Sequence, residues 1–255
     1  MPSLPPAFTT VPLAHRGLHD RSRGVVENSH SAIDAAVAAG YGIELDLQLS
    51  ADGEAMVFHD DELMRLTGEP GPVRDRTARA LGQTRLLDSD ETIPTLADIL
   101  AMVAGRVPLL IEIKDQSLTM GPVDGRLERR ACRLLAAYPG AAALMSFNPH
   151  SVAICRDTAP DIARGRVTCA FTGDYWAHLD MARRRELAVI DDLDALGCSF
   201  ISHQHSDLQS AEVSHVSDEG KPILCWTVRS AGAERAAREI AANVTFEGYL
   251  AEISA

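Results

Sequence analysis

The segment YGIELDLQLS (41–50) alternates apolar and polar side chains, and this alternation decides the predicted fold. Successive side chains of a β-strand point to opposite faces, so a period of two predicts a strand. Glu44 and Asp46 then share one face of this strand, while the apolar residues between them occupy the other. The Ala-rich segment before it (28–40) is typical of a helix, with Asn28 or Ser29 as its cap.

Strand and helix patterns alternate along the rest of the chain. The other expected strands are at 11–17, 55–60, 107–114, 141–148, 164–170, 199–203, 222–228 and 244–251. The other expected helices are at 95–105, 124–137, 149–158, 180–196, 210–219 and 230–242. About eight βα units fit in 255 residues, at roughly 32 residues each, which suits parallel strands joined by helical crossovers.

The chain length favours one particular α/β architecture. A (β/α)8 TIM barrel typically has about 250 residues, and this chain has 255. A doubly wound open sheet is the alternative, but no GxGxxG opens the first helix, and polar residues recur where several strands end. We therefore expect a single barrel domain over 1–255, with a short insertion or lid after the second strand at about 60–94, where Gly, Pro, Asp and Arg are frequent.

Composition excludes several classes of partner. The formal net charge of −12 argues against a nucleic-acid binder and against adhesion to an anionic membrane. No CxxC occurs among the five cysteines, which indicates a reducing compartment without a disulfide framework or zinc cluster. Because no signal peptide or spanning apolar run is found, we expect a cytoplasmic protein with no stable membrane anchor. The oligomeric state stays open.

A second strand, VPLLIEIK (107–114), carries charged residues in the same alternating way. Glu112 and Lys114 share a face, and at the rim of a barrel they converge with Glu44 and Asp46. Three carboxylates at short range repel one another, and a divalent cation removes that repulsion. Oxygen ligands favour Mg²⁺ or Ca²⁺, with Mn²⁺ also accepted. The alternative is that these carboxylates are exposed strand charges or pair with Lys114.

Two histidines end neighbouring strands beside this acidic group. His15 is followed by Arg16, and His59 is followed by Asp60. Histidine titrates near neutral pH, so a pair can supply a general base and a general acid. An arginine can bind a phosphate with two parallel hydrogen bonds. A cation, two basic side chains and two histidines together indicate phosphoryl chemistry.

The motifs occur in an order that resembles one known family. They are HRG (15–17), EN (27–28), ELD (44–46), FHDDELMRLTG (58–68), IPTL (93–96), IEIK (111–114), SFN (146–148) and WTV (226–228). Together they resemble the glycerophosphodiester phosphodiesterases, a phosphatidylinositol-phosphodiesterase-like group of TIM barrels, from residue 11 to about 250. The resemblance implies metal-dependent hydrolysis of a small glycerophosphodiester to glycerol 3-phosphate and an alcohol.

The resemblance also implies a role for particular residues of this chain. The implied metal ligands are Glu44, Asp46 and Glu112, and the implied acid/base pair is His15 and His59. The implied substrate-binding residues are Arg16 and Lys114 at the phosphate, with Phe147 and Trp226 at the pocket wall. Glu27 and Asn28 have an implied supporting role. Which histidine is the acid stays open.

Other interpretations remain beside this one. A related barrel phospholipase or lysophospholipase D is the alternative enzyme, and a catalytically silent binder of phosphodiesters is the non-enzymatic alternative. Arg229 after WTV and the segment GYLAE (248–252) depart from the family pattern, which leaves the alcohol specificity open. His203 and His205 lie at a strand end, where local hydrogen bonding is favoured over substrate contact. Tyr175 and Trp176 lie in a loop that either shapes the pocket or is mobile.

Overall fold

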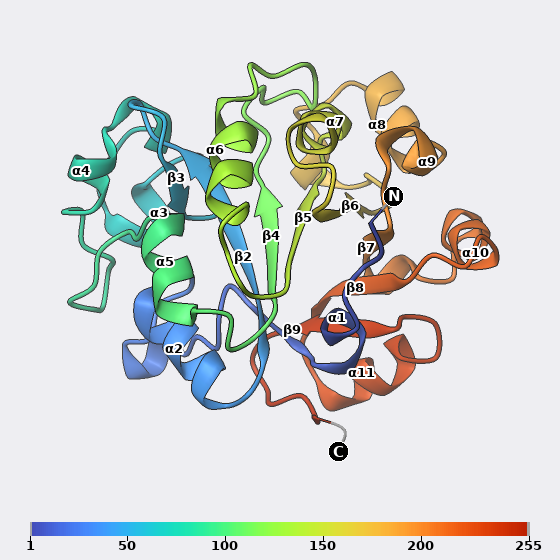
Figure 1. The fold of residues 1–255 in the computed structure, drawn as a ribbon, viewed down its shortest axis with the longest axis horizontal. Coiled ribbons are helices and arrows are strands. Elements are labelled where there is room, and N and C mark those ends of the chain that lie inside the picture. The colour runs from blue at the N-terminus through green and yellow to red at the C-terminus, as the bar shows by residue number, and fades with distance from the viewer. Residues whose placement is uncertain (1, 254–255) are drawn as a thin grey trace.

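The computed structural model describes residues 2–253, within which eight parallel strands close into a barrel (Figure 1). These strands are β1 (Leu13–His15), β2 (Gly42–Leu49), β4 (Leu109–Ile113), β5 (Ala142–Ser146), β6 (Ala163–Thr168), β7 (Phe200–Gln204), β8 (Ile223–Val228) and β9 (Asn243–Phe246). β1 pairs in parallel with both β2 and β9, so the sheet has no free edge at that point. The predicted TIM barrel is confirmed, and the open sheet is not formed.

Helices surround the barrel. They are α1 (Ala7–Thr10), α2 (His30–Ala38), α5 (Leu96–Val103), α6 (Arg126–Leu135), α7 (Pro149–Thr158), α8 (Met181–Ala188), α9 (Leu193–Leu196), α10 (Ala211–Asp218) and α11 (Ala231–Ala237). Ser29, and not Asn28, caps α2 by accepting a hydrogen bond from the amide of Ala32. Thr95 caps α5 in a capping box with Asp98.

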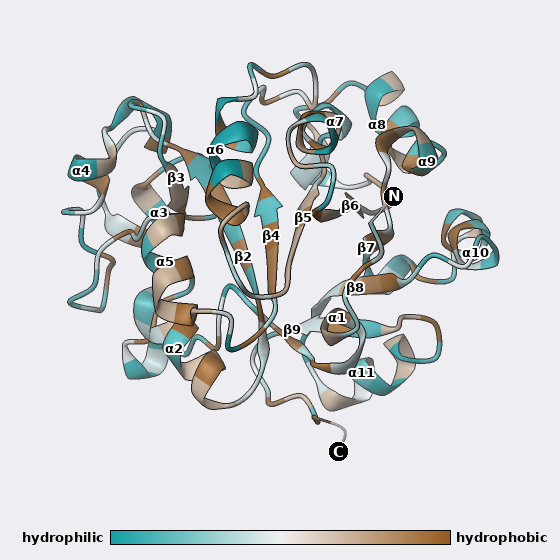
Figure 2. Ribbon diagram, viewed as in Figure 1, coloured by the Kyte–Doolittle hydropathy of each residue, from teal (hydrophilic) through white to brown (hydrophobic). Residues whose placement is uncertain are grey.

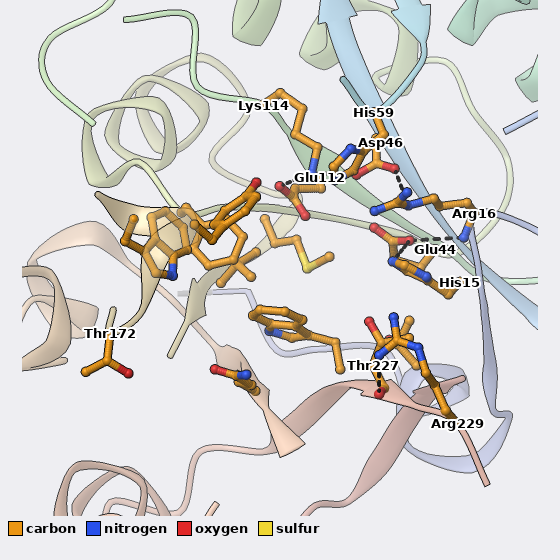
Figure 3. Close-up of a pocket in the computed structure, with 18 residues that line it drawn as sticks. His15, Arg16, Glu44, Asp46, His59, Glu112, Lys114, Thr172, Thr227 and Arg229 are labelled. Carbon is orange, nitrogen blue, oxygen red and sulfur yellow. Dashed lines mark hydrogen bonds and ion pairs between the residues drawn. The ribbon is translucent and has the colours of Figure 1, made fainter. Parts of the chain in front are cut away.

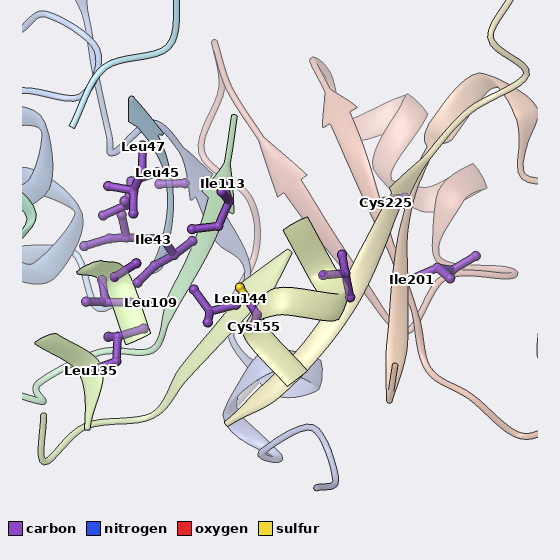
Figure 4. Packing of buried hydrophobic residues seen from close by; sticks show 14 of the residues in the cluster. Ile43, Leu45, Leu47, Leu109, Ile113, Leu135, Leu144, Cys155, Ile201 and Cys225 are labelled. Carbon is purple, nitrogen blue, oxygen red and sulfur yellow. The ribbon is translucent and has the colours of Figure 1, made fainter. Parts of the chain in front are cut away.

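Strand alternation divides the apolar residues between two cores. Ile43, Leu45 and Leu47 point outward from β2 and pack with the surrounding helices (Figure 4). A smaller cluster fills the inside of the barrel and includes Leu13, Phe200 and the buried Phe8 of α1. In Figure 2 the shafts of strands β4 and β5 are coloured mainly as hydrophobic, while the loops beyond their arrowheads are mainly hydrophilic. The polar face of β2 is thereby left for the barrel mouth.

The insertion after the second strand is more ordered than its composition indicates. β3 (Ala55–Val57) runs antiparallel to β2, and the short helices α3 (Met64–Thr67) and α4 (Ala78–Leu81) follow it beside the barrel (Figure 1). Apolar side chains of the insertion at 60–94 form a cluster with Met56 and Phe58, which precede it, and with Val26. The strand predicted at 55–60 ends at Val57, so His59 lies in the loop after the strand.

Two other predicted boundaries were wrong for local reasons. The helix predicted at 180–196 is split into α8 and α9 by the non-helical residues 189–192, where Asp192 forms an ion pair with the buried Arg166. The strand predicted at 244–251 ends at Phe246, and Gly248 then adopts a φ of 77°, which a strand does not allow. No helix in residues 2–253 is long and apolar enough to cross a membrane.

Candidate active site

Three carboxylates from two neighbouring strands meet at the mouth of the barrel. Glu44 and Asp46 lie on β2 and Glu112 lies on β4, where the register places Asp46 beside Glu112. All three side chains are buried, and one oxygen from each lies within 4.8 Å of the other two. The shared face that the alternation predicted is therefore present (Figure 3).

Burial and repulsion favour a positive charge among these carboxylates. Burial, reinforced by the neighbouring carboxylates, raises the pKa of Glu44 well above its ordinary value. Although burial also acts on Asp46, Lys114 and His59 hold the pKa of Asp46 well below its ordinary value. Because the donors are hard oxygen atoms, the cluster fits Mg²⁺, Ca²⁺ or Mn²⁺ better than a soft metal ion.

Two basic side chains border the carboxylates. Lys114 Nζ lies 2.8 Å from Asp46 and 2.7 Å from Glu112. Arg16 Nη1 donates to Glu27 at 2.6 Å. Arg16 Nε lies 3.3 Å from Asp46 but has no hydrogen-bond partner within the part of the chain that the structure describes. A buried donor without a partner is costly, so an anionic ligand oxygen would stabilise Arg16.

Backbone geometry fixes the turn that carries Arg16. Arg16 has a φ of 57° and Gly17 a φ of 81°. A Cβ on Gly17 would lie 2.7 Å from the carbonyl carbon of Ala32, so only glycine fits there. The carbonyl of Arg16 accepts a hydrogen bond from the amide of Asn28 at 2.8 Å. The buried Asn28 in turn donates from Nδ2 to Asp46 at 2.9 Å, which holds that carboxylate in place.

His15 is held by a carboxylate from the far end of the chain. Its Nδ1 lies 2.5 Å from Glu247, which follows β9, while its Nε2 lies 4.0 Å from Glu44. A carboxylate at Nδ1 favours the tautomer protonated there and leaves Nε2 free to accept a proton. Burial lowers the pKa of His15 to about 4, so the imidazole is neutral at pH 7. Arg229 Nε donates to the other oxygen of Glu247 at 2.7 Å.

His59 has the same kind of partner on the insertion. Its Nδ1 lies 2.6 Å from Asp60. Arg65 donates to Asp60 at 2.6 Å and to Glu27 at 2.8 and 2.9 Å. Burial alone would raise the pKa of Glu27, but Arg65 and Arg16 lower it to about 2. This chain of ion pairs connects the loop that carries His59 to the guanidinium of Arg16.

A cavity of about 310 Å³ opens beside the charged residues. Its other wall is aromatic: the rings of Phe147 and Trp226 are 5.5 Å apart, and those of Phe147 and Trp176 are 5.1 Å apart. Trp226 is anchored by a hydrogen bond of 3.0 Å from its Nε1 to the carbonyl of Ser202. A preformed cavity with one charged and one aromatic wall fits a small molecule that carries an anionic group.

The structure brings most of the predicted site residues together. Nine of them line this cavity (Figure 3), namely His15, Arg16, Glu44, Asp46, His59, Glu112, Lys114, Phe147 and Trp226. Glu27 and Asn28 lie behind the cavity, where they contact Arg16 and Asp46. His203 is buried and pairs with Asp207 at 3.1 Å, outside the cavity lining. Neither His203 nor His205 is among the lining residues, which agrees with the expectation that they serve local hydrogen bonding rather than substrate contact.

Sequence reasoning missed several residues that shape the site. Glu247 and Arg65 were not singled out, and Asp60 was noted only as the neighbour of His59. Glu247 comes directly after the end of β9, which is the kind of position that drew attention to His15 and His59. The open question about the loop after β6 is answered, because Tyr175 and Trp176 line the cavity.

Comparison with known proteins agrees with this site. A model described as the glycerophosphoryl diester phosphodiesterase family matches residues 15–246. The Bacillus subtilis protein YhdW, provisionally named a glycerophosphodiester phosphodiesterase, is 28% identical over 230 residues, with 86% of each chain covered. A glycerophosphodiester phosphodiesterase of Caldanaerobacter subterraneus subsp. tengcongensis is 31% identical over 169 residues, which cover 61% of this chain and 65% of that protein.

Solved structures share the fold. An Oleispira antarctica phosphodiesterase in complex with the product sn-glycerol-3-phosphate has a TM-score of 0.75 at 23% identity, with 94% of each chain covered. A glycerophosphodiester phosphodiesterase of Thermotoga maritima has a TM-score of 0.69 at 21% identity, with 93% of this chain and 94% of that chain covered. Since the family model spans almost the whole barrel, this protein belongs to the glycerophosphoryl diester phosphodiesterase family.

Proposed function

We propose that this protein hydrolyses glycerophosphodiesters to glycerol 3-phosphate and an alcohol with the help of one divalent cation. The main support for this proposal is the cavity, in which oxygen atoms of three buried carboxylates lie within 4.8 Å of one another, beside two histidines. Membership of the family supports the same class of reaction. The product named for the Oleispira antarctica phosphodiesterase is consistent with it.

The cation would be held by Glu44, Asp46 and Glu112. Their fit is supported by the raised pKa of Glu44, which comes first from burial and then from the neighbouring carboxylates, and a bound cation would offset both effects. When bound, a divalent cation polarises the phosphate and offsets the charge that develops on its oxygens. Asn28 and Lys114 keep Asp46 oriented through contacts of 2.9 and 2.8 Å.

Arg16 and Lys114 bind the phosphate in this proposal. Arg16 lines the cavity, and its buried Nε, 3.3 Å from Asp46, has no hydrogen-bond partner among the described residues. Glu27 holds the opposite side of the same guanidinium at 2.6 Å and so limits its rotation. Lys114 lies between Asp46 and Glu112, where its ammonium balances part of their charge before the substrate arrives. Phosphate oxygens would then meet two fixed positive groups.

The two histidines move the protons. His15 is neutral and has a free Nε2 on the side of the carboxylates, which suits a general base that activates the attacking oxygen. His59 has its Nδ1 held by Asp60, which suits a general acid that protonates the leaving alcohol through Nε2. Glu247 and Asp60 act as positioning residues, because each fixes one imidazole without lining the cavity.

The test is release of glycerol 3-phosphate from glycerophosphocholine. Chelated protein should be inactive and should recover when Mg²⁺, Ca²⁺ or Mn²⁺ is added singly. His15→Ala and His59→Ala should each remain folded and nearly inactive, whereas His215→Ala, on the exposed face of α10, should keep full activity. Full activity of chelated protein would contradict the proposal, and faster turnover of lysophosphatidylcholine would favour the alternative phospholipase D.

A further inference from the structure

A second cleft, of about 580 Å³, opens directly beside the catalytic cavity. Three loops form it: the start of the insertion after β3, the loop after β4 and the loop after β6. The cleft and the cavity share six lining residues, which are His59, Glu112, Lys114, Phe147, Tyr175 and Trp176. A substrate bound at the carboxylates can therefore extend into this cleft without leaving the protein surface.

The two spaces differ in charge. Three carboxylates and three basic side chains line the catalytic cavity, so its charges balance before a cation binds. The second cleft is lined by one basic side chain, Lys114, and by five carboxylates: Asp60, Asp61, Glu62, Glu112 and Asp115. A bound divalent cation would make the cavity positive, while the cleft would stay negative. The cleft is thus suited to a positively charged group.

Two of the carboxylates in the cleft are available to a ligand. Asp61 and Glu62 are exposed and form no ion pair with any residue in 2–253. Asp61 accepts one hydrogen bond, from Gln48 Nε2 at 3.0 Å, which orients it without neutralising it. Asp60, in contrast, is already paired with Arg65 at 2.6 Å. The negative charge that faces the cleft is therefore not compensated by the protein.

An aromatic ring faces the same space. Tyr175 is 71% exposed and is supported from behind by Trp176, whose ring centre is 4.9 Å away at an angle of 86°. Tyr175 lines both the cleft and the catalytic cavity, so its ring lies where the two spaces meet. Aromatic faces combined with carboxylates bind ammonium groups well.

We propose that this cleft binds the alcohol half of the substrate and selects alcohols that carry a positively charged ammonium group, such as choline or ethanolamine esters. The inference rests on the proposed hydrolysis, because it assumes that the phosphate lies at Arg16 and Lys114. His59 lines both spaces, so it stands between the phosphate and the alcohol. That position also fits the role of His59 as the acid that protonates the leaving oxygen.

The experiment compares two substrates that differ in the charge of the alcohol. Glycerophosphocholine carries an ammonium group, and glycerophosphoglycerol carries none. The wild-type protein should have the higher kcat/KM for glycerophosphocholine. The double variant Asp61→Asn, Glu62→Gln should lose about tenfold in kcat/KM for that substrate, mainly through KM, and the loss should shrink as salt is added. Its kcat/KM for glycerophosphoglycerol should stay within about twofold of the wild-type value.

A matched control carries the same chemical changes on another face. Asp218→Asn, Glu239→Gln removes two exposed carboxylates outside both lining sets and should leave both substrates unaffected. Equal kcat/KM of the wild-type protein for the two substrates, or equal losses in the double variant, would overturn the inference while the hydrolysis stands. If the metal-loaded wild-type protein hydrolyses neither substrate, the proposed function itself fails.

Discussion

Replacing Glu247 with Gln tests whether a long-range carboxylate controls His15. The substitution keeps the size of the side chain and removes the charge that lies 2.5 Å from His15 Nδ1. Glu247 is outside the lining of the cavity, and its partner Arg229 is mostly exposed at the edge, so the carboxylates, Arg16 and Lys114 should keep their places in the variant. The expected change is therefore in kcat, with KM and metal affinity close to the wild-type values.

The size of the loss follows from the type of hydrogen bond. A hydrogen bond to a charged group contributes about 1.5–3 kcal/mol. Each 1.36 kcal/mol in the activation free energy changes the rate about tenfold. Since the Gln carbonyl can still accept from Nδ1, we expect kcat for glycerophosphocholine to fall about 10- to 100-fold, in the range typical for residues that orient a functional histidine.

The barrel offers a matched control for this variant. Asp207 pairs with His203 at 3.1 Å, which is the same chemical arrangement placed outside the cavity. Asp207→Asn should leave kcat unchanged, and thermal unfolding should show that both variants are folded. The reasoning is refuted if Glu247→Gln keeps the wild-type kcat, or if Asp207→Asn loses as much activity.

The remaining predictions concern the proton donor, the ion pairs and the metal site. His59→Ala should regain kcat to within about tenfold of wild type on the p-nitrophenyl ester of glycerol phosphate, because this leaving group needs no proton. His15→Ala should not recover, and equal recovery of the two variants would contradict the assignment of His59 as the general acid. Glu27→Gln should lose about 3 kcal/mol of unfolding free energy in urea at pH 7, since ion pairing lowers the pKa of Glu27 from 4.5 to about 2. That stabilisation is complete above pH 4.5 and is lost as pH falls through 2, so a pH-independent difference from wild type contradicts it. Glu44→Gln should raise the Tm of metal-free protein at pH 7, because the raised pKa of Glu44 means that its charged form destabilises the fold. Scanning fluorimetry with and without Mn²⁺ should show that the metal ion raises the Tm of the wild-type protein but not that of the variant.

The carboxylates of the site could be predicted because their placement depends on local alternation. The period of two in 41–50 places Glu44 and Asp46 on one face, and parallel pairing of β2 with β4 then brings Glu112 beside them. Only the strand type and the closure of the barrel are needed for this result. The fold was predictable for the same reason, since repeating βα units of similar length fit few other architectures.

The partners of the histidines could not be predicted in this way. Glu247 is 232 residues from His15 in the sequence, and it reaches Nδ1 only because β9 pairs with β1 to close the ring. Arg65 belongs to a four-residue helix, which is too short to show a period. The orientation of His203 depends on strand parity, because a shift of one residue would turn it into the barrel.

The net charge of −12 does not show that the fold places positive and negative charge in two adjoining spaces. The buried carboxylates around Glu44 are costly for folding, so their presence is explained by the charge that they can bind rather than by stability. Once a cation offsets them, Arg16 and Lys114 leave the cavity positive, while Asp61 and Glu62 keep the adjoining cleft negative. A diester with a negative phosphate and a positive ammonium on its alcohol matches this order of charges. An acidic protein can thus select a zwitterion and reject the polyanions that its net charge repels.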